Sequence, residues 1–136
     1  MRPQKYLYDF VIQIALIVVV VALFRTNPDK LHASFWAAAL FVLMPLSMLS
    51  REWIFYRFTN KVWWASVLQF WLFFAVPIFV LRILHPRTSL DEVSVGFMPV
   101  SFWHQASNIS YLFMMSATLW SYWNYRKKEK SPGSKT

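Results

Sequence analysis

The chain has 136 residues, of which 57% are hydrophobic, 20% aromatic and 15% charged, whereas soluble domains average about 25% charged residues. This composition excludes an ordinary soluble domain, and the absence of Cys excludes disulfides and thiolate metal sites. The net charge of +8 would indicate nucleic-acid binding in a soluble protein, but here the basic residues flank apolar runs, so we expect no nucleic-acid partner.

Four apolar runs, each close to the ~20 residues that a helix needs to cross the hydrocarbon core of a bilayer, occupy most of the chain. They cover about residues 6–24, 31–50, 62–84 and 100–123. None of them alternates polar and apolar residues as the strands of a membrane barrel do. We therefore predict an all-α integral membrane protein with four transmembrane helices in one domain and no separate soluble core.

The first run follows Arg2 and Lys5, as the apolar part of a secretory signal peptide would. It ends at Phe24, however, where a signal peptidase needs a small residue, so we predict a retained helix. Asp9 and Gln13 are four residues apart and therefore share one face of this helix. For Asp9, solvation at the interface beside Lys5 is the simpler interpretation, and a proton-coupling carboxylate is the alternative.

The second and third runs each contain a proline, Pro45 and Pro77, and we expect a bend at each because proline removes a main-chain hydrogen bond. Between these runs, residues 51–58 combine basic and aromatic side chains that suit the headgroup layer of a bilayer. The third run contains Gln69. Because a polar side chain is costly in hydrocarbon and such groups usually face the bundle interior, we predict that Gln69 does so.

The fourth run is the most polar of the four. Four small residues at spacings of three, seven and four form a stripe where a neighbouring helix could approach closely, namely Ser107, Ser110, Ala117 and Ser121. A neighbouring stripe carries the polar side chains of His104, Asn108, Tyr111 and Thr118. We therefore expect this helix to be the least exposed to lipid and to carry intramembrane polar residues at Asn108 and Tyr111.

The charge distribution predicts how the chain is threaded. With four crossings, the two termini and the middle connection share one side and hold ten Lys and Arg residues, against four in the other two connections. The positive-inside rule then places both termini in the cytoplasm, which gives an up-down-up-down bundle over residues 1–125 in a cell membrane. Residues 126–136 are basic and contain almost no apolar side chain, so we predict a disordered cytoplasmic tail.

All three histidines, His32, His85 and His104, lie at or near the predicted non-cytoplasmic side. Imidazole is a common metal ligand and also titrates near neutral pH, so a metal or haem site, or a proton-responsive face, is one hypothesis. The simpler interpretation is structural, because none of the three shows the spacing of a ligand motif. We therefore predict no cofactor.

No catalytic motif is present: the chain has no P-loop, GxGxxG, HExxH or GxSxG pattern. Three hypotheses remain. The leading one is a non-enzymatic membrane subunit whose partners are the bilayer and either a second copy or a larger membrane complex. The alternatives are a small oligomeric transporter or channel using the intramembrane polar residues, and a membrane-embedded enzyme or metal site built from the outer histidines.

Overall fold

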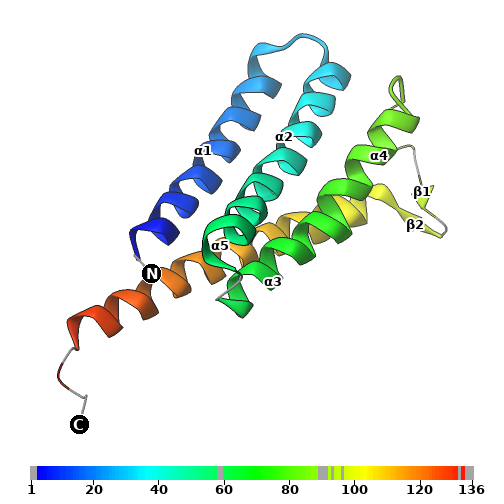
Figure 1. Cartoon of the computed structure of the whole chain (residues 1–136). Coiled ribbons are helices and arrows are strands. Elements are labelled where there is room, and N and C mark those ends of the chain that lie inside the picture. Colours follow the sequence, from blue (N-terminus) through cyan, green and yellow to red (C-terminus); the bar gives the residue numbers. More distant parts are fainter. Residues whose placement is uncertain are drawn as a thin grey trace.

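A computed structural model describes residues 3–57, 60–88, 92, 94–95, 97–131 and 133, and almost all of these are helical (Figure 1). The helices and strands are α1 (Gln4–Thr26), α2 (Lys30–Arg51), η1 (Glu52–Tyr56), α3 (Lys61–Phe70), η2 (Trp71–Ala75), α4 (Val76–Leu84), β1 (Ser94–Val95), β2 (Met98–Pro99) and α5 (Val100–Lys130). Here η1 and η2 are single π-helical turns that continue the helices before them.

Among the described residues, three helices are long and apolar enough to cross a membrane: Gln4–Thr26, Lys30–Tyr56 and Lys61–Leu84. They correspond to the first three predicted runs, and their length and apolarity are consistent with a membrane protein. The fourth predicted run is also helical, as the start of α5, but α5 does not reach the same apolarity. The reason is the set of polar side chains that this helix carries along its length.

The short connections are fixed by side chains that cap the helices. The Asp29 carboxylate accepts hydrogen bonds from the main-chain N–H groups of Leu31 and His32, at 3.0 and 3.2 Å, and so starts α2. The Asn60 side chain accepts from the N–H of Trp63 at 3.1 Å and starts α3 in the same way. At the end of η1, Arg57 adopts a left-handed backbone (φ 51°), which stops the second helix.

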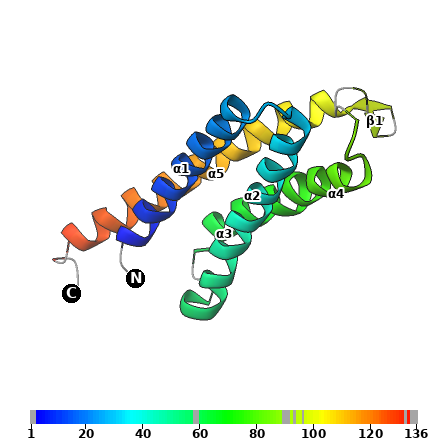
Figure 2. The same cartoon turned by 90° about the horizontal axis from the view of Figure 1, so that it is seen from above.

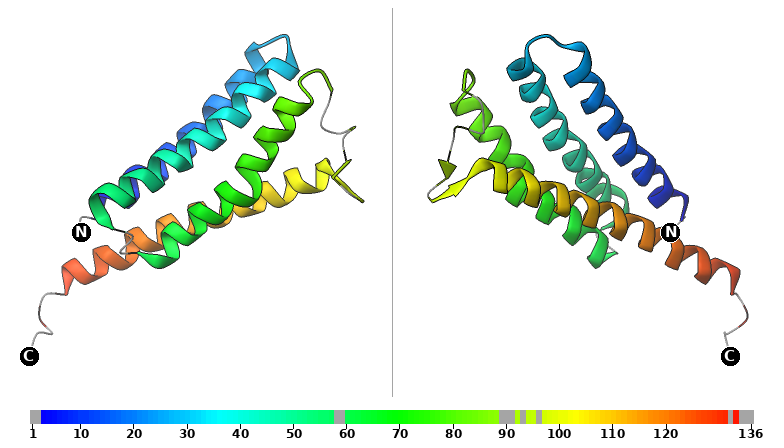
Figure 3. Two further views of the ribbon diagram at one scale, coloured as in Figure 1. Left: turned by 45° about the vertical axis from the view of Figure 1, so that its right-hand side comes forward. Right: turned by 180° about the vertical axis from the view of Figure 1, so that it is seen from behind.

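The two prolines are accommodated differently. Pro45 lies inside α2, which continues as an α-helix across it. Pro77 follows the π-helical turn η2, and the helix changes direction between α3 and α4 (Figure 3). A π-helical turn is a recognised cause of such a kink, and it stands next to the residue that lacks a main-chain N–H. The bend predicted in the third helix is therefore accompanied by a local change of helix type.

The last helix is longer than the sequence predicts. We expected it to end near Trp123 and the basic residues after it to be disordered, but α5 continues to Lys130. Arg, Lys and Glu have good helix propensity, and basic side chains in the last turn interact favourably with the helix dipole. Of the predicted tail, residues 132 and 134–136 lie outside the described part of the chain.

The helix α5 packs mainly against α1 and α3. The end of α5 that carries the C terminus lies against α1 and α3, while α1 packs on α2, and α2 on α4 (Figures 1 and 2). From the N-terminal end of α1 toward the β1–β2 hairpin, the α1–α2 pair and α5 separate from one another (Figure 3). The interior is consequently tightly packed at one end of the molecule and open at the other.

Candidate functional site

Four charged side chains, three buried and one, Arg51, partly exposed, form a cluster where the N-terminal turns of α1 meet the end of the second helix. The Lys5 ammonium forms an ion pair with Glu52 and lies 3.9 Å from the Asp9 carboxylate. Arg51 forms an ion pair with Asp9. Asp9 and Glu52 are completely buried, and the cluster contains two positive and two negative charges. The cluster therefore joins α1 to the second helix without leaving a net charge in the interior.

Aromatic rings surround the Lys5 ammonium. Its Nζ atom lies 4.0 Å from the ring centroid of Trp63, 4.5 Å from that of Tyr6 and 4.6 Å from that of Tyr56. Rings at these distances attract a cation through their negative faces, and more strongly when water is excluded. Tyr6 in turn stacks on Tyr125, with 5.4 Å between the ring centroids. The surroundings of Lys5 thus include side chains of all four long helices.

A hydrogen-bond network centred on Thr118 lies next to the charged cluster. The Thr118 hydroxyl accepts hydrogen bonds from the side-chain amide of Gln13 and from the indole N–H of Trp63, both at 3.0 Å. The Tyr111 hydroxyl donates to the main-chain carbonyl of Gln13 at 2.7 Å. All of these side chains are buried, so each bond satisfies a group that would be costly to leave unpaired. The network ties α1, α3 and α5 together.

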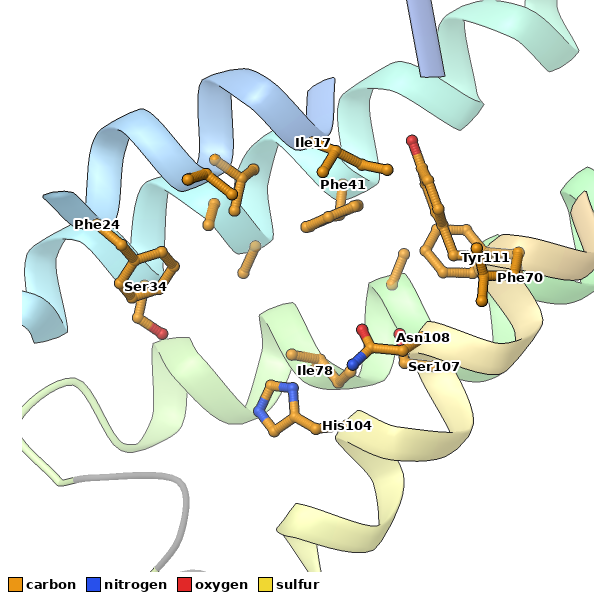
Figure 4. A pocket seen from close by; sticks show the side chains of 16 residues that line it. Ile17, Phe24, Ser34, Phe41, Phe70, Ile78, His104, Ser107, Asn108 and Tyr111 are labelled. Atoms are coloured by element: carbon orange, nitrogen blue, oxygen red, sulfur yellow. The ribbon is translucent and has the colours of Figure 1, made fainter. Parts of the chain in front are cut away.

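A cavity of about 470 Å³ occupies the open end of the molecule, between the α1–α2 pair and the helices α4 and α5 (Figure 4). Its polar side chains include His104, Ser107 and Asn108, which come from successive turns of α5 and project into the space. The rest of its wall is mainly apolar: Ile17, Val20, Val21, Phe24, Ala37, Ala38, Phe41, Phe70, Ala75, Ile78 and Leu112. No charged residue is among the described side chains that line it, and its size lies within the ~300–1,000 Å³ of small-molecule sites.

Three aromatic rings stand between this cavity and the Thr118 network. Phe41, Phe70 and Tyr111 all line the cavity, and their ring centroids are 5.2–6.2 Å apart in edge-to-face pairs. Tyr111 belongs to both regions, because its ring faces the cavity while its hydroxyl reaches Gln13. The apolar cavity and the buried polar network are thus adjacent but separated by packed rings.

The intramembrane polar residues named from the sequence fall into three places. Asp9 belongs to the charged cluster and Gln13 to the Thr118 network, and both are fully buried. The interpretation of Asp9 as solvated at the interface is therefore wrong, because Arg51 pairs with its carboxylate in the interior. Asn108 and Tyr111 line the cavity. Gln69 is exposed on α3 and joins none of these groups, so the structure does not place it in the interior as we predicted.

The predicted packing stripe of α5 is buried in its C-terminal half. Ala117 and Ser121 are buried, and the Ser121 hydroxyl accepts a hydrogen bond from the Asn60 side chain at 2.9 Å. Ser110 is half-buried, and Ser107 lines the cavity. The stripe therefore contacts neighbouring helices only where α5 lies close to them.

The three histidines are not brought together. The His32 ring is hydrogen-bonded at both nitrogens, to Asn27 and to the indole N–H of Trp36, each at 3.0 Å. His85 is exposed after α4, and His104 lines the cavity. Within the described ranges, no three His, Asp or Glu side chains form a group that could hold a metal ion.

Sequence reasoning assigned Arg51 and Glu52 to the headgroup layer and missed their part in the buried cluster. An acidic residue next to a basic one at the end of an apolar run is a weak signal, because such pairs are common at membrane interfaces. The neighbouring Trp53, Ile54 and Phe55 are indeed highly exposed on the protein surface. One turn of helix therefore contains both the buried Glu52 carboxylate and an exposed apolar segment.

Comparison with known protein families, curated proteins and solved structures finds nothing that matches this chain. The functional argument consequently depends on the charged cluster, the Thr118 network and the cavity.

Proposed function

We propose that this chain is a non-enzymatic multi-pass protein of a cell membrane that holds a lipid-like molecule between its helices. It crosses the bilayer four times in an up-down-up-down arrangement, with both termini in the cytoplasm. The observation that carries the proposal is the cavity of about 470 Å³ between the α1–α2 pair and α4–α5.

The side chains of α5 support a fourth crossing. Its exposed residues include seven large apolar or aromatic ones, Phe102, Ile109, Leu112, Phe113, Leu119, Trp120 and Trp123, beside the polar Ser101, Gln105, Asn108 and Ser116. Its buried positions include the polar Tyr111, Thr118 and Ser121. Large apolar groups on the outside and hydrogen-bonded polar groups on the inside are typical of a helix in lipid. The mean hydropathy of α5 does not show this difference between its two sides, because it averages over both.

The cavity favours a ligand with an uncharged head and a hydrocarbon body. Its apolar wall would contact the hydrocarbon, and His104, Ser107 and Asn108 would form hydrogen bonds with the head. A charged head would be left without a counter-ion among the described lining residues, which is costly in a medium of low dielectric constant. We therefore propose an uncharged amphiphile, such as a long-chain alcohol or a neutral lipid, as the occupant.

The test is to fill the cavity and measure which lipids copurify. Ala38→Phe and Ser107→Phe each place a ring in the cavity, and Ala15→Phe on the exposed side of α1 is the matched control. Mass spectrometry of extracts should find a neutral amphiphile with wild-type and control protein, and at least several-fold less with both cavity variants. Equal amounts in all four proteins, or none with the wild type, would refute ligand binding.

The proposed threading is tested separately with reporter fusions. Reporters after residues 57 and 131 and before residue 3 should be cytoplasmic, and those inserted near residues 28 and 86 should be outside. Finding the two termini on opposite sides of the membrane would refute the four-crossing arrangement.

Association with itself or with another membrane protein is part of the proposal, and the mass of the particle in mild detergent tests it.

A transporter is the second candidate, favoured by the buried polar network directly beyond the aromatic rings of the cavity. In that case Tyr111→Ala, which opens the ring layer, should raise solute flux in proteoliposomes. Wild-type and variant proteins that are both without flux would exclude the transporter.

A further inference from the structure

A second pocket, of about 310 Å³, lies at the closed end of the molecule, between the start of α3 and the last turns of α5. The residues that line it are Asn60, Lys61, Val62, Trp120, Ser121, Asn124, Tyr125 and Lys128. It is separate from the cavity described above and shares no residue with it. The polar character of this lining calls for a different kind of ligand.

The charge in this pocket is positive. Lys61 and Lys128 reach it from two different helices, and no acidic residue is among its described lining residues. Asn124 contributes a side-chain amide, whereas the Asn60 side chain is already engaged by Ser121 and by the main-chain N–H of Trp63. The pocket also lies at the first turn of α3, where the helix dipole favours an anion although the Asn60 side chain caps the N–H of Trp63. Two cations, an amide and a helix N-terminus therefore converge on one space.

The edge of the pocket is apolar. Val62 and Trp120 line it and are 62% and 63% exposed, so they would contact hydrocarbon in a bilayer. A phospholipid has the same arrangement, with an anionic phosphate on one side and acyl chains beginning on the other. Free phosphate would use only the cationic part of the pocket.

We propose that this pocket binds the phosphate of an anionic phospholipid in the cytoplasmic leaflet. The assignment to that leaflet rests on the proposed threading, in which the start of α3 and the end of α5 are cytoplasmic. Basic pockets between transmembrane helices on this side are a known means of binding anionic headgroups. Lys61 and Lys128 would form charge-assisted hydrogen bonds with the phosphate oxygens, and Asn124 would add a neutral one.

The experiment compares two double variants that remove the same number of charges. Lys61→Gln/Lys128→Gln removes the two pocket cations, while Lys127→Gln/Lys130→Gln removes two exposed lysines of the same helix end that lie outside this pocket. All four side chains are exposed, so neither substitution disturbs the core. Circular dichroism and size-exclusion chromatography check the fold of each protein.

Binding of phosphatidylglycerol and of phosphatidylcholine with the same acyl chains is measured by native mass spectrometry in detergent. We expect the wild type to prefer the anionic lipid, the pocket variant to lose roughly tenfold in affinity for it, and the control variant to lose much less. An equal loss in both variants would show non-specific attraction to a basic surface and would overturn the proposal. So would displacement of the lipid by millimolar inorganic phosphate, because the site would then be one for the free anion.

The failure of this proposal can be distinguished from failure of the proposed function. The lipid measurement is made in detergent and does not depend on the threading, which the reporter fusions test. The phenylalanine variants of the other cavity leave Lys61 and Lys128 intact, so those variants should keep their preference for phosphatidylglycerol.

Discussion

Removing the Lys5 ammonium should strongly destabilise the protein. In Lys5→Met the Glu52 carboxylate, which is completely buried, loses its cation, and the three rings around Lys5 lose theirs. Breaking a buried ion pair by removing one partner costs about 3–5 kcal/mol, compared with about 0–1 kcal/mol for an exposed pair. Because Asp9 keeps its pairing with Arg51, the expected loss comes from one uncompensated carboxylate and not from the whole cluster.

The free energy of unfolding is measured by titrating detergent-solubilised protein with dodecyl sulfate and following its helicity. The double variant Lys5→Met/Glu52→Met removes both charges of the pair, so it should recover most of the loss, to within ~2 kcal/mol of the wild type. Lys127→Met, which removes an exposed lysine, should change stability by less than about 0.5 kcal/mol. If Lys5→Met stays within ~1 kcal/mol of the wild type, or the double variant is as unstable as the single one, the pair does not stabilise the fold as we argue.

Two further outcomes are expected. Thr118→Val leaves the Gln13 amide and the Trp63 indole without their acceptor and should cost about 1–3 kcal/mol in the same titration. The control Ser116→Ala, whose exposed hydroxyl bonds only within α5, should cost less than about 0.5 kcal/mol, and equal losses would contradict the network. Elemental analysis of the purified protein, and of variants with His32, His85 or His104 replaced by Ala, should find negligible metal in all four, whereas a stoichiometric metal that depends on these histidines would refute the interpretation.

The helices were predictable because bilayer thickness and main-chain hydrogen bonding dictate them. An apolar run of about 20 residues forms a helix in lipid whatever its intrinsic propensity, and so the run with four consecutive valines, residues 18–21, is helical in α1. The predicted end of α5 was wrong, because hydropathy indicates where an apolar segment ends and not where a helix ends. The basic residues up to Lys130 are good helix formers outside the apolar run.

The interior face of a helix was predictable only where two polar residues fixed it. Asp9 and Gln13, one turn apart, define a common face, and both are buried, although we had interpreted Asp9 as solvated at the interface. Gln69 has no polar residue four positions away that would define a common face with it. Its polarity alone therefore did not determine which face of the helix it lies on, and it is exposed. Its prediction failed because a single residue carries no periodicity.

The sequence by itself determined the all-helical class of this protein, the position of its apolar helices and the charge asymmetry from which we predict their orientation, because these depend on local composition and on the thickness of a bilayer. Only the tertiary structure decided that Lys5 meets Glu52, that Gln13 meets Thr118, and that the helices separate to leave a cavity beside His104. Those contacts join residues far apart in the chain, and they depend on the angles at which helices cross. Such angles are set by the packing of whole helix surfaces, so they cannot be predicted from a single apolar run.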